Sequence, residues 1–318
     1  MKKRWSALAA ACAVLFTLAA CESGAGGKKN DDEAKTKLGM AVYGTDTVSA
    51  EEASIDAVVA AVLTDKEGVI LACKLDELQI KPTIEAGSLK NGGDYKTKGE
   101  LGDAYGMKAG GAKQEWYQQA EAFCKYVIGK TANQVAGIET ADGKATDADL
   151  SAGCTIAVTG FMKAVSMAAE NAAEGNVAAA DKLGIAVTAH RTGDASAPQY
   201  DAVFTAAAVG ADGKLTGCVV DELQKTLTIE NGGFKAESGD IKTKKQQGDA
   251  YSMKAASGIG LEWYEQVENL QNYLSGKTTA DIDGVTLKDG KAADLASGCT
   301  IAVSGMLQNV QKAMKNAA

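Results

Sequence analysis

The sequence contains a single histidine, His190, among its 318 residues. Catalytic arrangements that rest on histidine therefore cannot occur twice in this chain, and we expect His190 to be an ordinary strand or loop residue. Aromatic residues make up only 5% of the sequence, and the formal net charge is −8. Both features argue against nucleic acid as a partner, because phosphates favour a basic surface and bases stack on aromatic rings. The absence of a Cys-x-x-Cys pair weakens interpretations as a zinc site or a redox dithiol, and no metal site is expected.

The N-terminal residues have the pattern of an export signal. A basic head at 2–4 precedes a short apolar run that ends in small residues at position 20. Its last step, Leu-Ala-Ala-Cys, resembles a bacterial lipobox, which implies a signal peptide at 1–20 and a lipid on Cys21; an ordinary signal with a chance cysteine is the alternative. The Gly-rich, charged stretch that follows predicts a flexible tether at 21–37. We therefore expect an exported protein that is anchored through membrane lipid to the outer face of a bacterial cell membrane.

Five cysteines remain in the rest of the chain, and two interpretations of them are open. They are Cys73, Cys124, Cys154, Cys218 and Cys299. An exported protein permits one disulfide in each half, Cys73 with Cys154 and Cys218 with Cys299. Buried free thiols that behave as small apolar side chains are the favoured interpretation.

The chain repeats itself with an offset of 145 to 147 residues. Leu-Gly at 38–39 returns at 183–184, Trp-Tyr at 116–117 returns at 263–264, and the threonine at 155 returns at 300. A period of this length is typical of a duplicated domain rather than a solenoid. We predict a first domain at 38–172, a linker at 173–182 and a second domain at 183–318, each large enough for its own core. These two segments are called the first and second repeats below.

The pattern within each repeat predicts an α+β fold. Each repeat begins with a short strand, followed by two strands joined by a tight turn (56–78 and 201–223). A further strand contains Thr-Ile-Glu, and a helix with apolar residues at helical spacing ends at Gly-Lys (111–130 and 258–277). A strand with the sequence TIAV and a closing helix complete the repeat. We expect an antiparallel sheet with its helices gathered on one side.

Both repeats contain a Gly-Cys-Thr step behind an Asp-Leu pair. The stretches are DLSAGCTIAVTG at 149–160 and DLASGCTIAVSG at 294–305. Their small residues let a large ligand or another protein approach the backbone closely, and free backbone N–H groups can receive an anion. A threonine without a partner base is a poor nucleophile, so a hydrolase is discounted. An exposed hydroxyl in such a loop suits modification by another enzyme.

The second of these stretches resembles the D-x-x-S-G-A-T flavinylation motif of the FMN-binding domain family. In that family an ApbE-type flavin transferase uses FAD and Mg²⁺ to attach FMN through its phosphate to the final threonine. The resemblance implies two covalently attached FMN groups, on Thr155 and Thr300. The first repeat has Ala152 where the motif has Ser or Thr, which makes Thr300 the closer match. The other matching positions are Asp149, Gly153 and Cys154 in the first repeat and Asp294, Ser297, Gly298 and Cys299 in the second.

The wider sequence, with "GDAYGMK", "EWYQQAEAF" and "DADLSAGCTI", resembles the tandem-domain pheromone lipoproteins of Gram-positive bacteria. This resemblance implies flavin-based extracellular electron transfer from a membrane donor, a quinone/NADH dehydrogenase system, to external electron acceptors. We expect an electron carrier rather than a stand-alone enzyme. The candidates for packing against the flavin ring are Tyr105, Met107 and Trp116, with Tyr251, Met253 and Trp263 in the second repeat; ordinary core packing is the alternative.

Three further interpretations remain open. Lys108 and Lys254 face either the flavin or only solvent. Asp149 and Asp294 either order their loop or help the transferase to dock. The chain as a whole is, in the alternative from another class, a solute-binding or adhesive surface lipoprotein without a redox cofactor.

Overall fold

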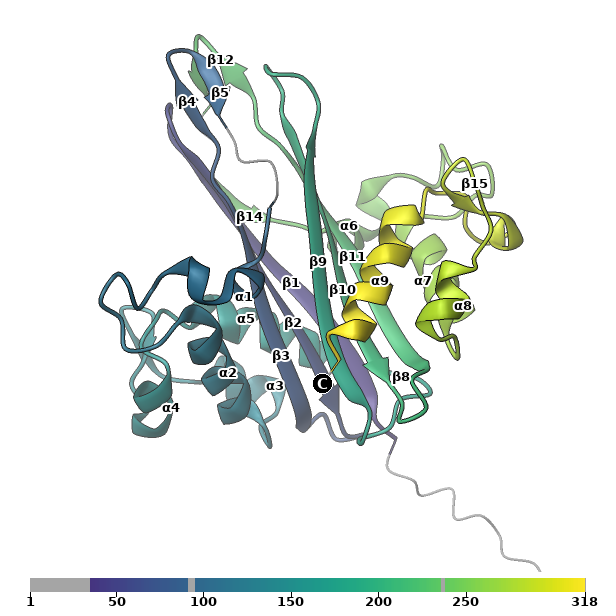
Figure 1. Ribbon diagram of the computed structural model, residues 1–318, viewed down its shortest axis with the longest axis horizontal. Helices are drawn as coiled ribbons and strands as arrows, with labels where there is room; N and C mark the ends of the chain where they lie inside the picture. Colours follow the sequence, from purple (N-terminus) through teal and green to yellow (C-terminus); the bar gives the residue numbers. More distant parts are fainter. Residues whose placement is uncertain (1–34, 91–94, 236–237, 318) are drawn as a thin grey trace, which may run out of the picture. The chain divides into compact units, whose positions relative to one another are not determined.

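The computed structural model describes residues 35–90, 95–235 and 238–317 (Figure 1). The predicted signal peptide, Cys21 and the tether up to residue 34 lie outside the described residues. The described residues form one compact unit. In the part of the chain that the structure describes, none of the helices has the length and apolar character needed to span a bilayer.

The first sheet is built on a meander of three long antiparallel strands, β1 (Lys37–Val48), β2 (Ala53–Thr64) and β3 (Ile70–Ile80). Both connections are short, as β-meanders require, and Gly68 takes a positive φ of 83° in the second one. Two short strands extend the sheet at β1. They are β8 (Ala173–Glu174) and β14 (Gly239–Ile241), the latter contributed by the second repeat.

The helices of the first repeat follow its third strand. They are α1 (Lys98–Leu101), the 3₁₀ helix η1 (Gly102–Tyr105), α2 (Trp116–Val127), α3 (Ala132–Ala136), α4 (Ala148–Gly153) and α5 (Thr159–Glu170). The hairpin of β4 (Thr83–Glu85) with β5 (Ser88–Lys90) precedes this series, and the hairpin of β6 (Thr140–Ala141) with β7 (Lys144–Ala145) lies between α3 and α4. The long helices α2 and α5 contact the sheet, because their buried residues recur every three or four positions along one side.

The second repeat presents its elements in nearly the same order. Its sheet consists of β9 (Lys182–Thr192), β10 (Gln199–Val209) and β11 (Leu215–Thr226), again antiparallel. The elements that follow are the hairpin of β12 (Ile229–Glu230) and β13 (Gly233–Phe234), α6 (Lys244–Gln247), η2 (Gly248–Tyr251), α7 (Trp263–Leu274), α8 (Thr279–Asp283), the hairpin of β15 (Leu287–Lys288) and β16 (Lys291–Ala292), η3 (Ala293–Leu295) and α9 (Ser304–Lys315).

Apolar side chains form three cores. One contains residues of β1, β2 and β3 together with residues of β9, β10 and β11, so the two sheets pack on each other through one face. The other two lie between each sheet and the helices of its own repeat, on the opposite faces (Figure 1). The chain is therefore a mixed α/β protein with antiparallel sheets, in agreement with the predicted α+β class. The boundary between two separate domains at 173–182 stays a prediction, and within it Val177 is buried in the core between the sheets.

The predicted strands at 155–158 and 300–303 are wrong. These residues lie in loops, where only Ala157 forms an isolated bridge with Lys144. The reason is that the last residue of each segment already begins a helix: Val158 and Val303 are the N-caps of α5 and α9. Both valines are fully buried beneath those helices, so the apolar run reflects a buried helix start rather than a strand.

Candidate functional site

The two threonines occupy equivalent loops at the start of the last helix of each repeat. Thr155 lies between α4 and α5 and is exposed, whereas Thr300 lies between η3 and α9 and is half-buried. Each follows a buried cysteine, Cys154 or Cys299. Thr155 therefore lies at the surface, while the cysteine before it packs in the core and holds the loop there.

A buried glutamine holds each threonine from the neighbouring helix. The Oε1 atom of Gln119 on α2 accepts hydrogen bonds from the backbone N of Thr155 at 2.8 Å and from its Oγ1 at 3.2 Å. Gln266 on α7 makes the same two bonds to Thr300, again at 2.8 and 3.2 Å. Both glutamines are almost completely buried. The structure thus builds one threonine–glutamine arrangement twice.

The amide nitrogen of each glutamine connects this pair to a predicted methionine. Nε2 of Gln119 donates to the carbonyl of Gln114 at 3.2 Å and lies 4.0 Å from the sulfur of Met107. In the second repeat, Nε2 of Gln266 lies 3.6 Å from the sulfur of Met253. The structure therefore brings both predicted methionines to the same glutamines as the predicted threonines.

A buried glutamate anchors the methionine loop to the start of the helix. Glu115 accepts hydrogen bonds from the backbone N atoms of Met107 and Lys108, at 2.9 and 3.1 Å. Glu262 does the same for Met253 and Lys254, at 2.8 and 3.1 Å. Each glutamate also takes part in the capping box of α2 or α7. The helix that carries the glutamine thus also fixes the loop that carries the methionine.

A buried lysine lies over the predicted aromatic rings. Lys98 pairs with Glu77 at 2.7 Å, and its Nζ lies 5.3 Å from the Tyr105 ring centroid and 5.9 Å from that of Trp116. Burial lowers the pKa of Lys98, but the charge of Glu77 and the hydrogen bond to it outweigh burial and raise the pKa above its ordinary value. The lysine is therefore a fixed cation beside the rings.

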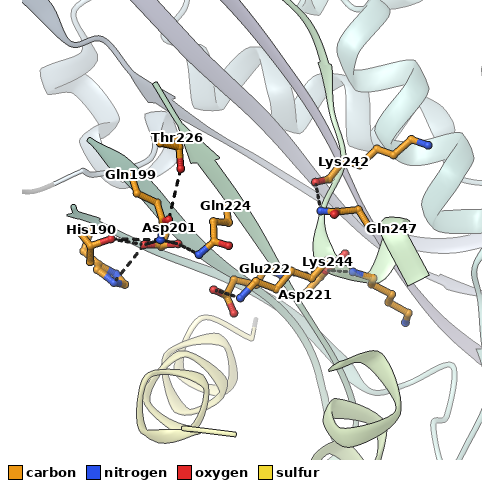
Figure 2. Close-up of polar contacts among 12 residues, drawn as sticks. His190, Gln199, Asp201, Asp221, Glu222, Gln224, Thr226, Lys242, Lys244 and Gln247 are labelled. Atoms are coloured by element: carbon orange, nitrogen blue, oxygen red, sulfur yellow. Dashed lines mark hydrogen bonds and ion pairs between the residues drawn. The ribbon is translucent and has the colours of Figure 1, made fainter. Parts of the chain in front are cut away.

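The second repeat contains the same lysine arrangement. Lys244 and Glu222, both labelled in Figure 2, form an ion pair. Nζ of Lys244 lies 2.8 Å from Oε1 of Glu222, 5.1 Å from the Tyr251 ring centroid and 5.7 Å from that of Trp263. Burial lowers the pKa of Lys244, but the charge of Glu222 and the hydrogen bond to it outweigh burial and raise the pKa above its ordinary value.

A neighbouring aspartate on the third strand secures the short helix that bears this lysine. Asp76 accepts from Oγ1 of Thr97 at 2.6 Å, and Asp221 accepts from Oγ1 of Thr243 at 2.6 Å. Burial raises the pKa of both carboxyls, and it raises that of Asp221 to about 6 despite three hydrogen bonds that oppose the shift.

The glycine and cysteine of each motif have packing roles. A Cβ atom at Gly153 would lie 2.9 Å from Cβ of Ala122, and one at Gly298 would lie 3.1 Å from Nδ2 of Asn269, so both glycines allow the loop to press against the helix. Desolvation raises the pKa of Cys154 to about 11, partly offset by a backbone hydrogen bond from Ile156. Desolvation also raises the pKa of Cys299, against a similar bond from Ile301.

The expected use of free backbone N–H groups as an anion site is wrong for these residues. The N atoms of Cys154 and Cys299 donate to the carbonyls of Leu150 and Leu295, both at 2.8 Å. The backbone N atoms of the two threonines donate to the glutamines. The backbone N atoms of the isoleucines that follow donate to the cysteine sulfurs. The loop has used these donors internally because its small residues let it fold tightly onto the helix.

Other predicted positions lie at the surface. Asp149, Asp294, Ser297, Lys108 and Lys254 are exposed. The carboxylate that orders the first loop is that of Asp147, which caps α4 by accepting from the N atoms of Asp149 and Leu150. The alternative that Asp149 and Asp294 help a transferase to dock stays a prediction.

His190 belongs to a separate polar group on the second sheet. It is an exposed residue of β9, and its Nε2 lies 4.0 Å from Oδ2 of Asp201 (Figure 2). Asp201 itself is buried and accepts hydrogen bonds from Thr192, Gln199 and Gln224. In the part of the chain that the structure describes, no group of three or more His, Cys, Asp or Glu residues is placed to hold a metal ion.

The residues that hold the predicted threonines, methionines and aromatic rings were not predicted from the sequence. These are Gln119, Glu115 and Lys98 in the first repeat and Gln266, Glu262 and Lys244 in the second. A signal was present, because both repeats share Glu-Trp-Tyr-x-Gln and both place Thr-Lys ahead of Gly-Asp-Ala-Tyr. A polar residue that recurs at the same place on a buried helix face indicates a buried hydrogen bond.

Comparisons with known proteins give a short match. A 48-residue segment is 44% identical to part of a chlorophenol reductase from Desulfitobacterium hafniense, and the match covers 15% of this chain and 15% of that protein. No family model matches the chain, and no solved structure matches it. The similarity thus concerns less than a fifth of either protein.

Proposed function

We propose that the chain is an electron carrier with two homologous FMN-binding-type domains, each with covalent FMN on a threonine, Thr155 or Thr300. The observation that carries this proposal is the duplicated bond system, in which a buried glutamine holds the threonine N and Oγ1 with the same pair of distances in both repeats. A buried glutamine needs a hydrogen-bond partner, and both repeats supply it from the loop that carries the threonine, which supports a role for that loop.

The loop fits a hydroxyl that another enzyme modifies. An ester at Oγ1 removes the hydroxyl proton and with it the 3.2 Å bond to Gln119, but the 2.8 Å bond from the backbone N remains. The loop therefore keeps its anchor after modification. Thr155 is exposed, which leaves space for a bulky group, and its loop has no bulky side chain between residues 151 and 154.

The surrounding side chains suit a flat, electron-accepting ring. Tyr105 and Met107 are half-buried, as are Tyr251 and Met253, so each presents some surface beside the glutamine and lysine of its repeat. The lysine cation stabilises negative charge that develops nearby, since its paired glutamate fixes its position. FMN supplies the one- and two-electron chemistry when bound.

The expected setting extends this proposal. Attachment of lipid to Cys21 would hold the protein at the outer face of a Gram-positive cell membrane. The partners are an ApbE-type flavin transferase, a quinone/NADH dehydrogenase system as electron donor, and external electron acceptors.

Co-expression with an active flavin transferase tests the proposal. We expect the mass of the wild-type protein to rise by two FMN groups, with adducts on the peptides that contain Thr155 and Thr300. Thr155→Val and Thr300→Val each remove one group, because valine keeps the shape and lacks the hydroxyl. The matched controls Thr159→Val and Ser304→Ala, close to the same loops, keep both groups. Unmodified peptides from cells in which another flavin acceptor is labelled would contradict the proposal.

Two cavities favour the alternative of a solute-binding lipoprotein. One of about 410 Å³ lies between β11 and α7, with Trp263 and Tyr264 in its wall. One of about 470 Å³ lies at the equivalent place between β3 and α2, with Trp116 and Tyr117. Both volumes suit small ligands. A protein with both threonines changed to valine that still binds a small molecule tightly would support this alternative.

A further inference from the structure

Two cysteines face each other across the cavity of the first repeat. Cys73 lies on β3 opposite Val62, a fully buried residue of the core under the helices, so its side chain is on the helix side of the sheet. Cys124 lies on α2, two turns after Trp116 and one turn after Ala120. One cavity of about 470 Å³ is lined by Cys73, Cys124, Trp116 and Ala120. The cavity thus brings one thiol from the strand and one from the helix together.

The two thiols are neighbours in this cavity. The Cys124 thiol and burial together raise the pKa of Cys73 well above its ordinary value, which agrees with that placement. The wall of the cavity also contains Tyr117 and Ile128, which are 37% and 44% exposed. Cys73 is itself half-buried, so part of its surface is open to a small reagent.

The second repeat lacks this pair. Cys218 occupies the place of Cys73 and also lines a cavity, but Gln271 occupies the place of Cys124. Oε1 of Gln271 accepts a hydrogen bond from the backbone N of Val220 at 2.7 Å, which joins α7 to β11. The second repeat thus has a polar link between the helix and the third strand where the first repeat has two thiols.

We propose that Cys73 and Cys124 form a dithiol that closes to a disulfide and ties α2 to β3 in the first repeat alone. The oxidant is a low-molecular-weight disulfide. One thiolate attacks a sulfur of that disulfide and releases one small thiol, and the second thiol then displaces the other small thiol from the mixed disulfide. One S–S bond breaks and one forms, two thiol protons pass to the two released thiols, and two electrons reduce the small disulfide.

The position of the pair gives this closure a local consequence. Cys124 lies on the same helix as Gln119, which holds Thr155. A covalent link between α2 and β3 restricts local opening of the helix, so the amides of α2 become better protected from exchange. The helix α7 has no such link and provides an internal reference.

Oxidised glutathione tests the proposal on the full chain. After incubation at mildly alkaline pH, free thiols are alkylated in denaturant without reduction, and the peptides are mapped by mass spectrometry. We expect a linked peptide that contains Cys73 and Cys124, with Cys218 and Cys299 alkylated. Amide exchange in α2 should slow about tenfold on oxidation, whereas that in α7 should not change.

Matched variants separate this pair from other linkages. Cys73→Ser and Cys124→Ser abolish the linked peptide and the slower exchange, while Cys218→Ser and Cys154→Ser keep both. If a serine variant fails to fold, Cys73→Ala or Cys124→Ala provides the same test without burying a hydroxyl. Five thiols that all remain free after prolonged oxidation, stable glutathione adducts, or a link from Cys154 to either cysteine would overturn the proposal.

Discussion

The two repeats agree where they surround the threonine and differ where they support it. The shared part is the chain of contacts from threonine through glutamine to methionine, glutamate and lysine, in which equivalent distances differ by no more than 0.4 Å. The support differs: Asp147 caps α4 in the first repeat, whereas Ala292 at the equivalent place provides no side-chain cap, and only the short η3 forms. In the second repeat, Nδ2 of Asn269 on α7 instead donates to the carbonyl of Gly298 at 2.9 Å. The side chains around the threonine are therefore specified more tightly than the loop that presents it.

The largest expected difference between the repeats is in pH dependence. Because the pKa of Asp221 is raised from 3.8 to about 6 by burial, the folded state binds its proton more tightly than the unfolded state. The stability that this carboxyl confers is fully present below its ordinary pKa and is lost as pH rises through about 6, by up to about 3 kcal/mol. Asp221→Asn removes this dependence. We expect the free energy of unfolding of the wild type, relative to that of the variant, to fall between about pH 4 and pH 7 in urea titrations.

Asp76→Asn is the matched change in the first repeat. Burial also raises the pKa of Asp76, but Asp76 is only half-buried. The free energy of unfolding of the wild type, relative to that of Asp76→Asn, should therefore fall less with rising pH. A difference between wild type and Asp221→Asn that does not vary with pH would show that Asp221 ionises normally in the folded protein.

The next largest effect concerns the glutamines. Gln119→Leu removes the acceptor of two bonds to Thr155, so we expect a loss of about 2 kcal/mol in the free energy of unfolding and an approximately tenfold lower rate of flavin attachment at Thr155 alone. Gln266→Leu should have the same effect at Thr300 alone. Peptide-resolved mass spectrometry follows both sites in one sample, and each unaltered repeat is the control. Equal slowing at both sites would point to a global loss of folding instead.

The comparison also explains how much was predictable from the sequence. The three long strands and the helices α2 and α7 follow from apolar periodicity and from turn residues such as Asp212-Gly213, which are local signals. A short motif also marks the two threonines in the sequence, and their role as flavin attachment sites stays a prediction. Gln119 was not, because its partner lies 36 residues away in the sequence and the helix pattern alone does not distinguish a buried glutamine from an exposed one.

Contacts between the repeats were equally hidden. The strand β14 has three residues and no clear periodicity, yet it pairs with β1, about two hundred residues earlier in the chain. Lys312 on α9 pairs with Glu100 on α1 and also donates to the carbonyl of Val187 at 2.7 Å. Such pairings depend on how the two sheets pack, which residue patterns within one repeat do not contain.

A glycine substitution sharpens the comparison of the two loops. Gly153→Ala places a methyl group 2.9 Å from Cβ of Ala122, which cannot move away without displacing α2, so we expect a loss of about 1–3 kcal/mol. Gly298→Ala meets the side chain of Asn269 at 3.1 to 3.3 Å, a less severe approach than 2.9 Å, and should cost less. Thermal unfolding measures both. Ala122→Gly alone costs about 1 kcal/mol in the interior of α2, so we expect the double variant to lose less stability than the two single losses added together. Additive losses would show that the clash lies elsewhere.

The smallest effect tests the cap that only the first repeat has. Asp147→Ala removes the acceptor for the N atoms of Asp149 and Leu150, and loss of such a cap costs about 1 kcal/mol. The exposed Asp149 is the control, because Asp149→Ala leaves the cap in place. If the threonine environment is held by Gln119 rather than by α4, Asp147→Ala lowers the unfolding free energy but leaves flavin attachment at Thr155 within about twofold of the wild type. A loss of attachment as large as that of Gln119→Leu would instead make the helix α4 part of what presents the hydroxyl, and the two repeats would then differ in how their threonines are held.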